Sequence, residues 1–353
     1  MNTSSTDIAA ALLAWYDRHA RVLPWRSKPG APPPDPFRVW LSEVMLQQTT
    51  VAAVIPYFEK FTTRWPDIPS LAAADDGEVM AAWAGLGYYA RARSLLACAR
   101  AVAGRGGHFP DTEAELRKLP GLGEYTAAAV AAIAFGRRAV VVDANVERVA
   151  ARLFSIDEPL PAARKAIRAA ADAITPTERA GDFAQAMMDL GASVCTSRAP
   201  KCLICPLGAM CEARSLGDPE RFPVKAVKKA KPTRRGSAFW IEREGAVLLV
   251  RRPGKGMLGA MRALPDDGWS ARGDGSGVVP LSGDWQTCGT VQHVFTHFAL
   301  EMQVLVWSGE ECCDPDGEQG EWWPLSRIGE AGLPTLFAKA ARLVMAQREE
   351  GTE

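Results

Sequence analysis

The sequence has 353 residues, of which 48% are hydrophobic and 23% charged, and its formal net charge is zero. Its longest strongly apolar run, residues 127–135, is far shorter than the ~20 residues of a membrane span, and residues 1–7 lack the pattern of a signal peptide. We therefore expect a cytoplasmic protein with no membrane partner, built from two or three compact units. Residues 1–235 carry a charge of +7 and residues 236–353 one of −7, as in a polyanion-binding module with an appended domain.

Residues 1–220 are predicted to form an all-α domain. The stretch from about residue 4 to 214 is rich in Ala, Leu and Arg, and no alternating strand pattern precedes residue 238. Proline and glycine interrupt it near residues 24, 32–34, 66–69, 104–107, 120–123 and 159–161. These breaks predict a series of short helices joined by turns.

Glu43 is the first candidate catalytic residue along the chain. At helical spacing it shares a face with Val39, Trp40, Leu46 and Gln47. Apolar neighbours favour the neutral form of a carboxyl group, which could then act as a general acid. The residues alone equally allow a surface glutamate on an amphipathic helix.

Residues 113–135 are predicted to form a helix, a glycine turn and a second helix. Gly121 and Gly123 would let the backbone approach a ligand, and the N–H groups that open the second helix can bind a phosphate oxygen. A bare Gly-x-Gly is also compatible with a plain structural turn.

Asp143 follows the apolar run 139–142 and precedes a helix predicted for residues 144–154. A plain helix N-cap is one interpretation. The positive end of the helix also favours the ionised carboxylate, so a capping Asp143 could face a developing cation. The two interpretations are compatible.

Four of the eight cysteines lie between residues 195 and 211, in the spacing Cys-x6-Cys-x2-Cys-x5-Cys. They are Cys195, Cys202, Cys205 and Cys211. Four thiolates this close can ligate zinc or a [4Fe–4S] cluster, and the single Cys-x2-Cys pair favours the cluster because zinc ribbons have two such pairs. Zinc and four unligated buried thiols remain the alternatives. Arg198 and Lys201 could contact phosphate.

A change in the sequence pattern marks the end of the helical domain. Residues 221–236 are predicted to be a basic linker, since six of the eleven residues 225–235 are Lys or Arg. Residues 237–353 are predicted to form an α+β domain. We expect its strands at 238–241, 246–250, 291–298 and 302–306 and its last helix at 336–347.

Several segments resemble one superfamily of repair enzymes. The cysteine spacing and the turn LPGLGEYTA (residues 119–127) resemble the cluster loop and the helix–hairpin–helix of endonuclease III-type base-excision glycosylases. The stretch SEVMLQQT (residues 42–49) is closely similar to the signature of MutY-type adenine DNA glycosylases. VDANVERV (residues 142–149) resembles the catalytic-Asp segment, with Ala144 where the family often has Gly. The resemblance extends from about residue 7 to 345.

The resemblance implies catalytic roles for four residues. Glu43 would protonate adenine and activate water, Asp143 would stabilise the sugar cation, and Asn145 would orient the sugar or the water. Tyr125 stands where bifunctional members carry the lysine that forms a Schiff base. A tyrosine there implies a monofunctional enzyme, in which Tyr125 hydrogen-bonds within the catalytic site.

The resemblance also implies contacts with DNA. Residues 23–26 and 183–191 resemble the adenine pocket, and residues 85–93 resemble a loop that wedges into the duplex. The implied substrate-binding residues of this part are Arg26 and Gln185 at the adenine, Gln48 and Thr49 at the orphaned base, Tyr88 as the wedge, and Gly121 and Gly123 at a phosphate. A plain core aromatic is the alternative for Tyr88.

The C-terminal residues resemble the Nudix-like domain of MutY proteins. The clustered Arg and Glu residues of the Nudix hydrolase signature are absent, so no pyrophosphate hydrolysis is expected. HVFTH (residues 293–297) resembles the loop that recognises 8-oxoguanine, which implies lesion contacts by Phe295, Thr296 and His297. Thr296 replaces the usual serine and adds a methyl group. Ordinary barrel-edge histidines are the alternative for His293 and His297.

We therefore expect an all-α helix–hairpin–helix glycosylase domain with a [4Fe–4S] cluster loop, followed by an α+β Nudix-like domain. The expected function is monofunctional excision of adenine mispaired with 8-oxoguanine or guanine. The expected partner is double-stranded DNA with such a mismatch, bound by a monomer that is nucleoid-associated if bacterial. The alternatives are a bifunctional lyase acting on oxidised pyrimidines and a non-catalytic, cluster-bearing DNA-binding protein.

Overall fold

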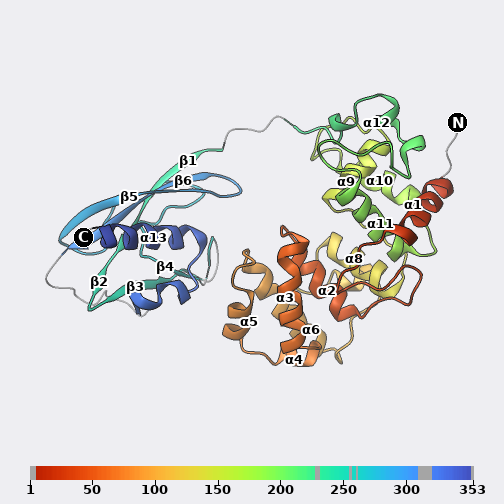
Figure 1. Ribbon diagram of the computed structural model, residues 1–353. Coiled ribbons are helices and arrows are strands. Elements are labelled where there is room, and N and C mark those ends of the chain that lie inside the picture. Colours follow the sequence, from red (N-terminus) through yellow and green to blue (C-terminus); the bar gives the residue numbers. More distant parts are fainter. Residues whose placement is uncertain (1–4, 227–230, 254–256, 260, 309–319, 351–353) are drawn as a thin grey trace. The chain divides into compact units, whose positions relative to one another are not determined.

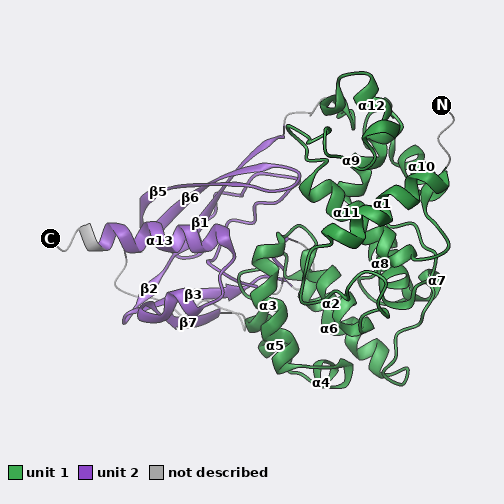
Figure 2. Ribbon diagram, turned by 45° about the vertical axis from the view of Figure 1, so that its right-hand side comes forward, with its two compact units in different colours: residues 1–227 green, residues 228–353 purple. Residues whose placement is uncertain are grey.

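The computed structural model describes residues 5–226, 231–253, 257–259, 261–308 and 320–350. The chain divides into two compact units, residues 1–227 and 228–353 (Figure 2). The division lies within the stretch that was predicted as a basic linker. No described helix is both long and apolar enough to cross a bilayer.

The regular elements of the first unit are helices, apart from one isolated bridge between Leu160 and Lys225 in its described residues (Figure 1). Six of its helices begin after an Asp or Thr whose side chain accepts a hydrogen bond from the first turn, which explains why they start there: Asp35, Thr50, Asp67, Asp75, Thr112 and Asp143. Its elements are α1 (Ser5–His19), α2 (Pro36–Leu46), α3 (Val51–Arg64), α4 (Ile68–Ala72), α5 (Asp76–Trp83), α6 (Ala90–Ala103), α7 (Glu113–Leu116), α8 (Glu124–Phe135), α9 (Ala144–Leu153), α10 (Arg164–Ile174), α11 (Ala180–Ser193) and α12 (Glu212–Ser215), with 3₁₀ turns η1 (Gly208–Met210) and η2 (Pro219–Arg221).

Two central helices, α8 and α11, organise this unit. Helix α8 is buried from Thr126 to Ala134, as expected for a helix that is apolar on all sides. It packs against α2, α7 and α11, and α11 also packs against α1 and α9. A side chain at Gly191 would place its Cβ only 2.6 Å from Asn145 Cβ, so this glycine lets α11 approach the start of α9.

The predicted hairpin of residues 113–135 consists of α7, the turn 117–123 and α8. Gly121 has φ +75°, a conformation that L side chains rarely adopt. A Cβ there would lie 2.6 Å from Ser94 Cβ on α6, so the close packing of the turn against α6 also requires glycine.

The second unit has the α+β composition that was predicted. One sheet has the order β1-β6-β5, with β1 parallel and β5 antiparallel to β6. In the other sheet β3 pairs with β2, β4 and β7. Helix α13 packs against β5 and β6. The elements are β1 (Thr233–Trp240), β2 (Glu242–Arg243), β3 (Ala246–Arg251), β4 (Arg262–Ala263), β5 (Asp284–Val294), β6 (Ala299–Ser308), β7 (Gly320–Pro324), η3 (Leu325–Glu330) and α13 (Thr335–Glu350).

Three strand predictions were wrong in extent. The strand expected at 302–306 spans Ala299–Ser308. The strand expected at 291–298 ends at Val294, because Phe295 N–H donates to the Phe298 carbonyl and closes a turn between β5 and β6. Strand β1 begins at Thr233, inside the predicted linker, because its first residues pair with Ala299–Glu301 of β6. This register depends on a partner about 66 residues away, which local sequence patterns do not reveal.

Candidate active site

A cavity of about 510 Å³ in the first unit brings together the predicted catalytic residues. Glu43 comes from α2, Tyr125 from α8, and Asp143 and Asn145 from the start of α9. The wall also contains the predicted base contacts Arg26, Gln48 and Thr49. The volume lies within the usual range for small-molecule sites, so the cavity could admit a nucleobase.

Glu43 is a buried carboxyl group, only 5% exposed. Tyr125 Oη donates a hydrogen bond to Glu43 Oε2 over 2.6 Å. Burial raises the pKa of Glu43 above its ordinary value, and the nearby Asp143 carboxylate adds to the rise, while the Tyr125 hydrogen bond and the Arg26 charge oppose it. The net upward shift favours a protonated Glu43, as a general acid requires.

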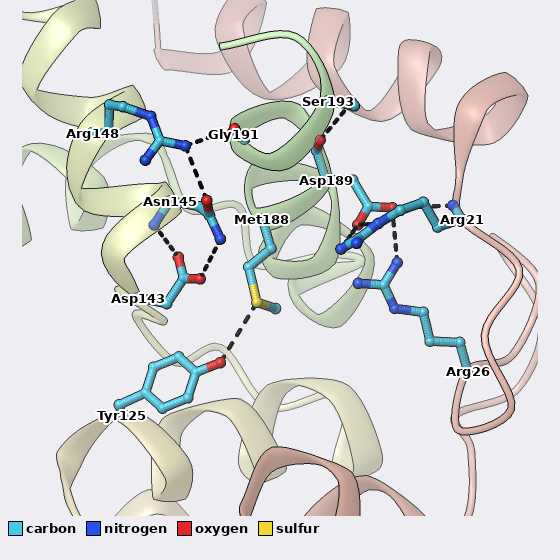
Figure 3. Close-up of polar contacts among 10 residues, drawn as sticks. All are labelled: Arg21, Arg26, Tyr125, Asp143, Asn145, Arg148, Met188, Asp189, Gly191 and Ser193. Atoms are coloured by element: carbon cyan, nitrogen blue, oxygen red, sulfur yellow. Dashed lines mark hydrogen bonds and ion pairs between the residues drawn. The ribbon is translucent and has the colours of Figure 1, made fainter. Parts of the chain in front are cut away.

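Asp143 is held rigidly at the N-terminus of α9. Its Oδ1 accepts hydrogen bonds from the backbone N–H groups of Asn145 and Val146, at 2.9 and 2.7 Å. Its Oδ2 accepts one from Asn145 Nδ2 at 2.8 Å (Figure 3). The N-cap prediction is therefore confirmed, and the carboxylate has a fixed direction at the cavity wall.

Tyr125 is partly buried and lines the cavity together with the two carboxyl groups. Burial raises the pKa of its phenol well above the ordinary value, and the charges of Glu43 and Asp143 raise it further. Its hydroxyl also lies 3.6 Å from Met188 Sδ on α11 (Figure 3). Tyr125 is therefore a neutral hydrogen-bond donor over the working pH range.

The Asn145 side chain is held by Arg148 as well as by Asp143. Arg148 Nη2 donates to Asn145 Oδ1 at 2.9 Å and to the Gly191 carbonyl at 2.6 Å (Figure 3). Arg148 Nε donates to the carbonyl of Cys195 at 2.8 Å. One guanidinium thus joins the start of α9, the end of α11 and the first cysteine of the loop.

The four clustered cysteines line a second, smaller cavity after α11. Among the described residues, no group of three or more His, Cys, Asp or Glu side chains is arranged to hold a single metal ion. A [4Fe–4S] cluster instead takes one thiolate for each iron, so its four cysteines surround a cavity. Burial raises the pKa of the Cys205 thiol to about 11, and the neighbouring thiolates add to this, so a cationic group in the cavity would favour its ionised form.

The contacts of the buried Arg152 side chain also indicate which kind of group the cysteine cavity can hold. Its side chain is 2% exposed and donates to Cys195 Sγ at 3.4 Å and to the carbonyls of Thr196, Ser197 and Phe222. No ion pair of Arg152 with a carboxylate occurs in the part of the chain that the structure describes. A buried cation is costly without a counter-charge, which four metal-bound thiolates would provide. The residues therefore fit an anionic thiolate cluster.

Comparisons with known proteins agree with this architecture. Residues 41–176 match the HhH-GPD superfamily base excision DNA repair protein family, and residues 237–343 match the NUDIX domain. The chain is 32% identical to the human adenine DNA glycosylase over 97% of this chain and 75% of that protein. It is 40% identical to the adenine DNA glycosylase of Mycolicibacterium smegmatis over 64% of this chain and 75% of that protein.

The chain belongs to the adenine DNA glycosylase (MutY) family. It is a DNA glycosylase of the base-excision repair type. Among solved structures, a thermostable thymine-DNA glycosylase is 30% identical with a TM-score of 0.54, covering 60% of this chain and 97% of that one. A non-covalent endonuclease III–DNA complex, 24% identical with a TM-score of 0.51, covers 61% of this chain and 98% of that one and shows the shared fold.

Two predicted DNA contacts of this family member have unusual backbones. Gln48 and Tyr88 have φ angles of 55° and 50°, in the left-handed region that non-glycine residues rarely occupy. Tyr88 is 55% exposed, which excludes the alternative of a core aromatic. Gln48 is also exposed.

Sequence analysis missed the residue that holds this region together, Arg91. It donates hydrogen bonds to the carbonyls at the end of α2, to Thr49 Oγ1 and to the carbonyls of the loop before Tyr88; the acceptors are Val44, Met45, Thr49, Leu86 and Gly87. Its guanidinium also lies 5.5 Å from the Tyr88 ring centroid. Three of its acceptors are more than 40 residues away, so only the tertiary structure shows this role.

Gln185 is the predicted base contact that the structure places differently. It is buried on α11 and does not line the cavity. Its Nε2 donates to the Gly181 carbonyl within the helix, whereas its Oε1 has no partner among the described residues. Four residues later, on the same face of α11, Asp189 contacts the cavity wall, and this residue was also missed.

The predicted lesion loop is a turn that is supported by stacked aromatic side chains. The Phe295 ring stacks on Phe298, with 4.7 Å between centroids, and contacts the His293 ring edge-on at 4.6 Å. Thr296 and His297 are exposed at the tip. Phe295 is thus mainly a support, and the exposed polar groups come from Thr296 and His297.

Proposed function

We propose that this protein excises adenine mispaired with 8-oxoguanine or guanine in duplex DNA, as a monofunctional glycosylase. The observation that carries the proposal is the single cavity in which a buried, hydrogen-bonded Glu43 faces Asp143. The names of the relatives support adenine as the base. The pair of carboxyl groups supplies the two charges that adenine excision needs.

The reaction begins with adenine turned out of the duplex into the cavity. Glu43 donates its proton to a ring nitrogen, and the glycosidic bond breaks with its electron pair leaving on the base. The fixed Asp143 carboxylate stabilises the cationic sugar, and Asn145 helps to orient it. The ionised Glu43 then accepts a proton from the water that adds to the sugar carbon, which restores the acid and leaves an abasic site.

Tyr125 accounts for the proposed absence of strong lyase activity. Its phenol cannot form the imine that a lysine would form with the sugar carbon. It lies instead at hydrogen-bonding distance from Glu43, 2.6 Å away, where it orients the general acid.

Three surfaces of the first unit are proposed to hold DNA. The first residue of the hairpin's second helix, α8, follows Gly123, which has no capping side chain, so the helix N–H groups are open to a phosphate. The exposed Tyr88 would enter the base stack next to the orphaned base, with Gln48 and Thr49 beside it. Arg198 and Lys201, both exposed on the cysteine loop, would contact the backbone.

In the second unit, Thr296 and His297 are proposed to read the lesion. Both have polar groups at an exposed turn that aromatic stacking fixes in place. The Thr296 hydroxyl can hydrogen-bond a base that differs from guanine in its oxo and N–H groups.

We infer that Cys195, Cys202, Cys205 and Cys211 hold a [4Fe–4S] cluster. When bound, the cluster would supply four linked metal–thiolate bonds that fix the loop 195–211. The Arg152 guanidinium, which donates to Cys195 Sγ, would balance its negative charge. The loop then presents Arg198 and Lys201 in a defined position.

Single-turnover release of adenine from a duplex with an adenine:8-oxoguanine mismatch tests the proposed function. We expect Glu43→Gln to lower the rate by about 10²–10⁴-fold, because glutamine cannot donate the proton, while binding to the duplex is retained. Borohydride trapping of the wild-type reaction is expected to give little covalent adduct.

Three outcomes would contradict the proposal. Release of adenine by Glu43→Gln at the wild-type rate would show that another group is the acid. Efficient trapping of a covalent adduct would show a lyase, and no release by wild type would favour a binding protein. Asp35→Asn, which changes an exposed helix cap near the start of the same helix, is the matched control.

A further inference from the structure

Asp189 is a buried carboxylate on α11 that the proposed mechanism does not use. Its side chain is 1% exposed. It accepts hydrogen bonds from Arg26 Nη1 at 2.7 Å, from Arg21 Nε at 2.6 Å and from the Arg21 backbone N–H at 3.1 Å (Figure 3). Arg21 and Arg26 belong to the segment between α1 and α2, which has no regular secondary structure over these residues. Asp189 therefore ties one cavity wall to α11.

Arg26 is the cation nearest to the general acid in this wall. Its side chain is 7% exposed and lines the cavity with Glu43. Among the described contacts, Arg26 forms an ion pair with Asp189 and none with Glu43. Burial opposes the charge of Arg26, but the hydrogen bond and charge of Asp189, with smaller contributions from Tyr16 and Glu43, raise the pKa of Arg26. Arg26 therefore remains charged beside Glu43.

Glu43 lines the same cavity as Arg26 and already feels its charge, so it could pair with an unrestrained Arg26 guanidinium. A Glu43–Arg26 ion pair would favour the ionised carboxylate and remove the proton that adenine needs. The groups that face Glu43 are Tyr125 from α8, Asp143 from the start of α9, and Arg26 itself. Asp189 is not among them, so any influence of Asp189 on Glu43 passes through Arg26.

We propose that Asp189 is a positioning residue of the catalytic cavity, which holds the Arg26 guanidinium against α11 and so prevents it from pairing with Glu43. This inference rests on the proposed role of Glu43 as the proton donor. The buried Tyr16 of α1 lies close enough for the charges of Arg26 and Asp189 to affect its pKa.

The test is the pH profile of single-turnover adenine release. Glu43 acts in its protonated form, so the wild-type rate is expected to fall as the pH rises through the Glu43 pKa. In Asp189→Asn, Arg26 is free to pair with Glu43, and this fall is expected at lower pH. Compared with wild type, Asp189→Asn should lose about tenfold more rate at pH values above this fall than at pH values below it. Asp189→Glu, which keeps the charge, is expected to restore the wild-type midpoint, which is the pH at which the rate has fallen by half.

Asp182→Asn is the matched control, because Asp182 is an ion-paired carboxylate on the same helix that does not line the cavity. It should leave the midpoint unchanged. An unchanged midpoint in Asp189→Asn would overturn the inference. A wild-type enzyme without an alkaline fall, or a Glu43→Gln variant at full rate, would instead overturn the proposed function.

A second pair of variants covers the case in which Asp189→Asn does not fold. Arg26→Met removes the guanidinium, and Arg26→Met combined with Asp189→Leu replaces the buried ion pair with apolar side chains, which is often tolerated. Both are expected to show the same midpoint, because Asp189 acts only through Arg26. A lower midpoint in the double variant would overturn the inference.

Discussion

At the scale of single residues, the two carboxyl groups proposed to be catalytic differ because their surroundings differ. Glu43 sits in the buried face of α2 and has one donor, Tyr125. Asp143 has three donors and the N-terminus of α9. Burial thus favours the proton on Glu43, while three donors at the start of α9 fix the direction of the Asp143 carboxylate.

Tyr125→Phe tests this balance at Glu43. The Tyr125 hydrogen bond opposes the rise of the Glu43 pKa, so its removal should raise that pKa further. Because the rate depends on protonated Glu43, the alkaline fall in adenine release is expected at higher pH than in wild type. The shift is opposite to the one expected for Asp189→Asn.

The measurement is the same single-turnover pH profile, with the melting temperature as a check on folding. Tyr89→Phe is a suitable control, because Tyr89 does not line the cavity. A fall at lower pH in Tyr125→Phe would mean that the phenol does not act on Glu43 through this hydrogen bond.

At the scale of elements, α11 connects the parts of the site. It contacts α9 at Gly191, the cavity wall at Met188 and Asp189, and the cysteine loop at its C-terminal end. The loop and α9 are joined in turn by Arg148 and Arg152. The cysteines therefore shape a loop that is fastened to the helix bearing Asp143, although none of the described cysteines lines the cavity that contains Glu43.

Arg152→Met tests the charge balance of the cysteine loop. The variant removes the buried cation but keeps an unbranched side chain, so the cluster should be lost about tenfold faster in air. Iron and acid-labile sulfide per chain, with visible absorption over time, are the measurements. Arg198→Met changes an exposed arginine of the same loop and should keep wild-type iron content. A wild-type protein that contains zinc and no sulfide would contradict the cluster.

At the scale of the whole molecule, the proposed excision and the proposed lesion recognition belong to different units. The cavity and the cysteine loop are in the first unit, and the exposed turn with Thr296 is in the second. This division predicts that changes at the turn alter the preference between mismatches without altering the chemistry.

Thr296→Val tests the division. The variant keeps the shape of the side chain but loses the hydroxyl. The rate of adenine excision opposite 8-oxoguanine should therefore fall by about three- to tenfold when the enzyme concentration is limiting. Excision opposite guanine, and the maximal single-turnover rate, should not change. Thr290→Val on β5 is a control outside the turn. Equal losses with both mismatches would exclude Thr296 as a discriminating contact.

Local sequence was sufficient for the features that depend on a few neighbouring residues. The helix starts, the glycine turn of the hairpin, the cap at Asp143 and the crowding of the cysteines all have causes within a few residues. The resemblance of the motifs to a known family then supplied the catalytic candidates. The structure places Glu43, Tyr125, Asp143 and Asn145 around one cavity.

The tertiary structure decided the features that depend on distant partners. Asp189 meets Arg26 across 163 residues, and Arg91 reaches the end of α2 across more than 40. The start of β1 depends in the same way on its pairing with β6. In a helical sequence pattern, a charged residue predicts a solvent-exposed side chain. Only the folded chain shows that such a side chain is buried and which group it binds. The sequence by itself thus determined the chemical groups, and the packing of distant segments determined their charges and directions.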